Sequence, residues 1–97
     1  MKNTISSLGG KWFQIIFCRN IDNGDSLGNC EVDHHSGPMI RVDISQSHRE
    51  VVDTLVHEIL HAQFPCLKEE AVTQAATEIT KALIDTEVIE VEEPQTR

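Results

Sequence analysis

The chain contains no tyrosine, only three phenylalanines and one tryptophan, and only three cysteines in 97 residues. With so few aromatic side chains, its core is expected to be thin and mainly aliphatic. Three cysteines cannot all pair within one chain, and none stands in a Cys-x-x-Cys arrangement, which argues against a four-thiolate zinc site or a redox pair. Reduced thiols favour a cytoplasmic location.

Long apolar runs and clustered basic residues are also missing. No run approaches 18 apolar residues and the N-terminus lacks an apolar export segment, so neither a membrane partner nor export is expected. Eight basic residues face sixteen acidic ones, giving a net charge of -8, and the basic residues are scattered. Nucleic acid is therefore not an expected partner, and the sequence does not indicate an oligomeric state.

Short β-branched and aromatic runs predict strands. Residues 12–18 (WFQIIFC) form one such run, and residues 19–28 are predicted to be a loop. Residues 29–33 and 39–44 flank a turn-like insert, His34-His35-Ser36-Gly37-Pro38, and predict a β-hairpin with one buried face. The sequence predicts a single domain over residues 1–85 and an acidic, disordered tail over residues 86–97.

Two helices are expected after the hairpin. Ser47 and Glu50 have the spacing of a capping box, in which each side chain accepts a hydrogen bond from a backbone N–H at the helix start. Pro65 should end this first helix, and a second should run from about Lys68 to Asp85. The predicted fold is α+β, with a small antiparallel or mixed sheet of about three strands packed on two antiparallel helices.

The first predicted helix carries His57-Glu58-Ile59-Leu60-His61, an H-E-x-x-H motif. Residues four apart lie one turn apart on the same helix face, so both imidazoles can bind one Zn²⁺ ion per chain. Such an ion lowers the pKa of a bound water, and Glu58 would act as the general base for peptide hydrolysis. Salt-bridged surface histidines are the alternative interpretation, and Mn²⁺, Co²⁺ or Ni²⁺ remain open as the metal.

A third metal ligand is expected at the start of the second helix. Glu69 lies beside its apolar stripe and should point toward the first helix, whereas Glu70 is rotated toward solvent. The helical wheel therefore favours Glu69 as the third ligand and keeps Glu70 as the alternative.

The segment Val56-His57-Glu58-Ile59-Leu60-His61-Ala62, followed by the early glutamate of the next helix, resembles the gluzincin class of zincin metallopeptidases. More narrowly, it looks like the ImmA/IrrE-type peptidases and very small phage-encoded relatives. The resemblance spans roughly residues 29–83. This chain has Thr73 where that family usually has Asn or Asp four residues after the ligand.

The resemblance implies a zinc metallopeptidase that takes a peptide or protein segment in extended form. In zincins the strand before the active-site helix commonly binds the substrate backbone, which here implies Ile40 and Val42 on an edge strand. With no tyrosine to stabilise the oxyanion, the candidates are His34, His35 and His48, although exposed loop histidines are the commoner case. The alternative function is a zinc-stabilised, non-catalytic module that binds a protein or peptide.

Overall fold

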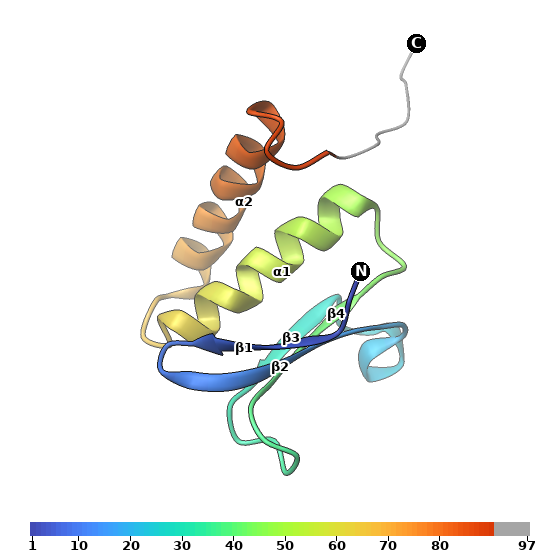
Figure 1. Cartoon of the computed structure of the whole chain (residues 1–97), viewed down its shortest axis with the longest axis vertical. Coiled ribbons are helices and arrows are strands. Elements are labelled where there is room, and N and C mark those ends of the chain that lie inside the picture. The colour runs from blue at the N-terminus through green and yellow to red at the C-terminus, as the bar shows by residue number, and fades with distance from the viewer. Residues whose placement is uncertain (91–97) are drawn as a thin grey trace.

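The computed structural model describes residues 1–90. In chain order its elements are β1 (Thr4–Leu8), β2 (Lys11–Cys18), the short 3-10 helix η1 (Ile21–Gly24), β3 (Gly28–Glu31), β4 (Met39–Asp43), α1 (His48–Gln63) and α2 (Glu69–Asp85). Figure 1 shows α1 lying across one face of the sheet and α2 on the side of α1 away from the sheet. The predicted α+β architecture is confirmed.

The sheet has four strands in the order β1-β2-β4-β3, one more than predicted. The predicted hairpin is confirmed, because β3 pairs antiparallel with β4. The additional strand is β1, which pairs antiparallel with β2. Its sequence, TISSL, carries no alternating apolar signal: Ile5 is 63% exposed and only Leu8 is buried. Cross-strand pairing, rather than side-chain pattern, makes this segment a strand.

The parallel pairing of β2 with β4 determines which strand lies at the edge. Between these two strands the chain passes through η1 and then β3, and β3 takes the outer position. The expectation that the strand before the helix is an edge strand is therefore wrong: β4 has a neighbour on both sides, and the edge next to it is β3.

The core lies between the sheet and α1. Phe13 and Ile15 of β2 and Ile40 and Val42 of β4 face the helix and are almost completely buried, together with Leu8 and Val51. The α1 side chains that pack against this cluster are Leu55, Ile59 and Ala62. A mainly aliphatic core was the expectation from composition, and Phe13 is its one fully buried aromatic side chain among residues 1–90.

The start and end of α1 follow its sequence signals. The Ser47 side chain accepts a hydrogen bond from the Glu50 N–H at 3.2 Å, and Glu50 Oε1 accepts one from the Ser47 N–H at 3.1 Å, which confirms the capping box. The helix ends at Gln63, two residues before Pro65. After a short loop, α2 packs on α1 through Val72 and Ala76, both fully buried.

The predicted tail, residues 86–97, lies mostly outside the described residues. Of its first part, the Thr86 N–H donates to Ala82 O at 3.1 Å and the Ile89 N–H donates to Leu83 O at 3.3 Å. The segment from Thr86 to Ile89 is therefore hydrogen-bonded to the C-terminal end of α2.

Candidate metal centre

The two histidines of the motif meet on one face of α1. The Nε2 atoms of His57 and His61 are 3.1 Å apart, and their side chains are 20% and 27% exposed. The four-residue spacing places one ring a helical turn above the other. Both rings therefore present a nitrogen to the same point outside the helix.

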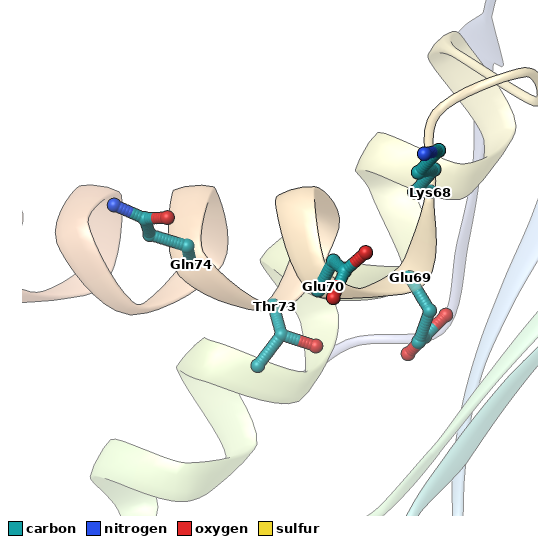
Figure 2. Close-up of a pocket in the computed structure, with 5 residues that line it drawn as sticks. All are labelled: Lys68, Glu69, Glu70, Thr73 and Gln74. Carbon is teal, nitrogen blue, oxygen red and sulfur yellow. The ribbon is translucent and has the colours of Figure 1, made fainter.

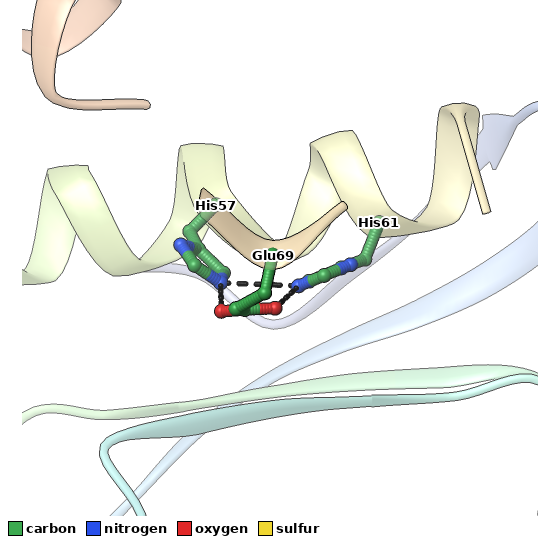
Figure 3. Close-up of side chains that lie close together, drawn as sticks. All are labelled: His57, His61 and Glu69. Atoms are coloured by element: carbon green, nitrogen blue, oxygen red, sulfur yellow. Dashed lines mark hydrogen bonds and ion pairs between the residues drawn. The ribbon is translucent and has the colours of Figure 1, made fainter. Parts of the chain in front are cut away.

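Glu69 completes this group from the first residue of α2. Its Oε1 lies 2.7 Å from His57 Nε2 and its Oε2 lies 2.8 Å from His61 Nε2 (Figure 3). The loop after α1 turns the chain back, so that a residue eight positions after His61 reaches the same point. The sequence predicted this convergence, and the structure brings the three side chains together.

The three side chains could hold a metal ion. Their ligand atoms all lie within 4.8 Å of one another. Around a tetrahedral ion with ligand bonds of about 2.0–2.1 Å, neighbouring ligand atoms are separated by about 3.3 Å, close to the observed spacing. Two neutral imidazole nitrogens and a carboxylate oxygen form a donor set that suits several divalent transition metals.

Glu70 does not belong to this group. Within residues 1–90 the cluster that could hold a metal consists of His57, His61 and Glu69. Figure 2 shows the two glutamates leaving the first turn of α2 in different directions, along a shallow pocket that Thr73 and Gln74 also line. The structure thus favours the third ligand that the helical wheel preferred.

Glu58 lies beside the cluster, on the side of α1 that faces β3. It is only 8% exposed. Burial raises the pKa of the Glu58 carboxyl above its ordinary value, with His57 and His61 opposing the rise and Glu69 adding to it. A carboxylate that binds a proton more readily than usual, next to a candidate metal group, has the properties of a general base.

Two β3 residues that the motif does not reveal lie next to Glu58. A Cβ atom built on Gly28 would lie 3.3 Å from Glu58 Oε2. Burial, together with the Glu58 carboxylate, raises the pKa of the Cys30 thiol to about 11, and Cys30 packs against the core. Within residues 1–90 Cys30 does not belong to the cluster that could hold a metal, and a thiol packed in this way commonly serves the core. Only a glycine inside a strand could have hinted at this contact from sequence.

Ile40 and Val42, predicted to bind substrate, are core residues. Both are 0% exposed, and β4 pairs with β2 on one side and with β3 on the other. A central strand has no free backbone edge for a peptide, so this prediction is wrong. The edge strand beside β4 is β3, and β1 forms the opposite edge of the sheet.

The remaining histidines lie apart from the cluster. His34 and His35 stack on each other in the β3–β4 loop, and His34 Nε2 lies 3.7 Å from Glu31 Oε2. His48 begins α1, nine residues before His57, a separation of about 13 Å along a helix. None of the three belongs to the group of His57, His61 and Glu69 that could hold a metal ion.

Comparison of the chain with protein-family profiles, with curated proteins and with solved structures finds no match. In the described part of the chain, no helix is long and apolar enough to cross a membrane.

Proposed function

We propose that this protein is a zinc-dependent peptidase in which Glu58 is the general base. The observation that carries the proposal is the convergence of His57, His61 and Glu69 within 4.8 Å, with the buried Glu58 carboxyl beside them. The three ligands come from two helices, and three protein ligands are the number that leaves the fourth position of a catalytic zinc site to water or substrate. The similarity of the motif to gluzincins supports the same function.

Each residue has a defined part in the reaction. His57, His61 and Glu69 would hold the ion, which when bound polarises the substrate carbonyl and lowers the pKa of water. Glu58 accepts the proton of the attacking water and donates it to the departing amine. The raised pKa of the Glu58 carboxyl favours this role, because a carboxylate with a higher pKa is a stronger base toward the attacking water.

The substrate backbone would pair with β3 rather than with β4. Among the strands in residues 1–90, none pairs with the outer side of β3. The Asp43 N–H donates to Leu27 O, so by the alternation of an antiparallel pair the backbone N–H and C=O of Cys30 point away from β4. An extended peptide added there would run beside Glu58.

The test combines metal analysis with hydrolysis of a library of fluorescence-quenched peptides. We expect about one zinc per chain in the wild type, loss of zinc in His57→Ala and Glu69→Ala, and retention in Glu70→Ala, the matched control. Glu58→Gln should keep zinc and lose hydrolysis by about 100-fold or more.

If the wild type binds one zinc per chain but hydrolyses no peptide, the peptidase proposal is overturned, and the alternative of a zinc-stabilised peptide-binding module is favoured. Unchanged hydrolysis in a zinc-loaded Glu58→Gln protein would overturn the assigned role of Glu58.

A further inference from the structure

The backbone conformation of Gly28, the first residue of β3, does not require a glycine. The glycines with positive φ in the described chain are Gly9, Gly10, Gly24 and Gly37, so Gly28 has a conformation open to other residues. A glycine inside a strand weakens the strand and often marks a place where another part of the structure approaches closely. The reason for Gly28 must therefore lie in what it contacts.

The space beside Gly28 is filled by α1. A Cβ atom at this position would lie 2.5 Å from Thr54 Cγ2, 3.2 Å from Arg41 O and 3.3 Å from Glu58 Oε2. Thr54 and Glu58 are four residues apart and share the helix face that lies on β3. The absence of a side chain thus lets this face of α1 approach the edge strand.

Thr54 cannot give way without a further loss. Its hydroxyl donates a hydrogen bond to Gln46 Oε1 at 3.0 Å, and rotating the side chain to move Cγ2 would break that bond. A side chain at Gly28 would instead displace the turn of α1 that carries Glu58, and would press on the carboxylate itself.

We propose that Gly28 is a positioning residue for Glu58, because its missing side chain lets the Glu58 carboxylate lie against the edge strand. This inference rests on the proposed function for its effect on catalysis. The contact of Gly28 with Glu58 places the carboxylate where a peptide paired with β3 would pass. A displacement of a few tenths of an ångström would move the carboxylate away from the proton that it must accept.

The experiment compares Gly28→Ala, Thr54→Ser, the double variant and Gly24→Ala with the wild type, all as full-length, zinc-loaded chains. Thr54→Ser removes Cγ2, the atom nearest to the added Cβ, and keeps the hydroxyl. In the double variant the new methyl group therefore meets mainly Glu58 Oε2 and Arg41 O. Gly24→Ala is the matched control: it adds a Cβ at φ +89° with no atom within 4 Å, so it strains the fold away from Glu58.

For Gly28→Ala we expect kcat on the peptide library to fall roughly tenfold, with KM and zinc content near those of the wild type. In the double variant the thermal midpoint should recover toward that of Thr54→Ser while kcat stays low. Gly24→Ala should lower the midpoint and leave kcat unchanged. Full recovery of kcat together with stability in the double variant would overturn the proposal, since Gly28 would then serve only helix packing.

A readout that does not need activity separates this inference from the proposed function. The carboxyl ¹³C resonance of Glu58, assigned with Glu58→Gln, should shift in Gly28→Ala and in the double variant, and not in Gly24→Ala. If the wild type cleaves no peptide, the proposed function fails, and the Glu58 resonance alone then tests whether Gly28 positions the Glu58 carboxylate. An unshifted resonance in the double variant would overturn the inference even in an active enzyme.

Discussion

Replacing Glu58 with glutamine should make the metal-free protein more stable at neutral and alkaline pH. The Glu58 side chain is 8% exposed, and burial raises the pKa of its carboxyl. The ionised form is thus held in a place where water can solvate it only in part. Glutamine has the same shape and no charge, so the variant removes that cost while keeping the packing against β3.

The sign of the pH dependence follows from the raised pKa. The folded state binds the Glu58 proton more tightly than the unfolded state, whose carboxyl has a pKa near 4.5. Below that pH both states are protonated and the wild type suffers no penalty. As the pH rises through the raised folded value the wild type loses stability, and the loss is complete above it. Glutamine does not titrate, so the stability of Glu58→Gln relative to the wild type should increase as the pH rises above 4.5.

The advantage should reach about 1–2 kcal/mol, the usual cost of an incompletely solvated buried polar group. For a domain of this size each kcal/mol moves the thermal midpoint by roughly 4–8 °C. The assay is thermal unfolding followed by circular dichroism from pH 4 to 9 in a chelator, with Glu70→Gln as the control for loss of an exposed carboxylate. Equal midpoints for wild type and Glu58→Gln at pH 8, or a lower one for the variant, would refute the reasoning.

Three further predictions concern the metal and the helices. Zinc affinity can be measured by competition with a chromophoric chelator. Glu69→Ala should weaken zinc binding by more than about 100-fold, since even residues that contact the ligands indirectly are worth about 10–100-fold, and Glu70→Ala should weaken it by less than about threefold. Equal effects of the two variants would contradict the ligand assignment. Thr80 is 2% exposed and its Oγ1 has no hydrogen-bond partner within residues 1–90, so Thr80→Val should raise the free energy of unfolding in urea by about 1 kcal/mol. The same change at exposed Thr77 is its control, and a destabilised Thr80→Val protein would argue against an unsatisfied hydroxyl. Ser47→Ala should lower the unfolding free energy by about 1 kcal/mol through loss of the capping box, and a change below 0.3 kcal/mol would show that this cap contributes little.

Local signals in the sequence determined both helices and most of the candidate site. The Ser47–Glu50 spacing, Pro65 and the four-residue spacing of His57 and His61 act within one or two helical turns, where few neighbours compete with them. The role of Glu69 could be predicted for the same reason, because the short turn places the start of α2 near the end of α1 and the helical wheel shows which side of α2 faces α1.

Only the tertiary structure decided which strand is central and what surrounds Glu58. Strand order depends on pairings between residues far apart in the chain, which a period-two pattern does not encode. The edge position of residues 39–44 was implied only by the resemblance to zincins, and in the structure β4 is central, with Ile40 and Val42 in the core. Polar β1 became a strand because β2 offered it a free edge. The contact of Gly28 with Glu58 arises because β3 takes the outer position beside β4 and α1 packs against it, an approach of elements that no local rule predicts.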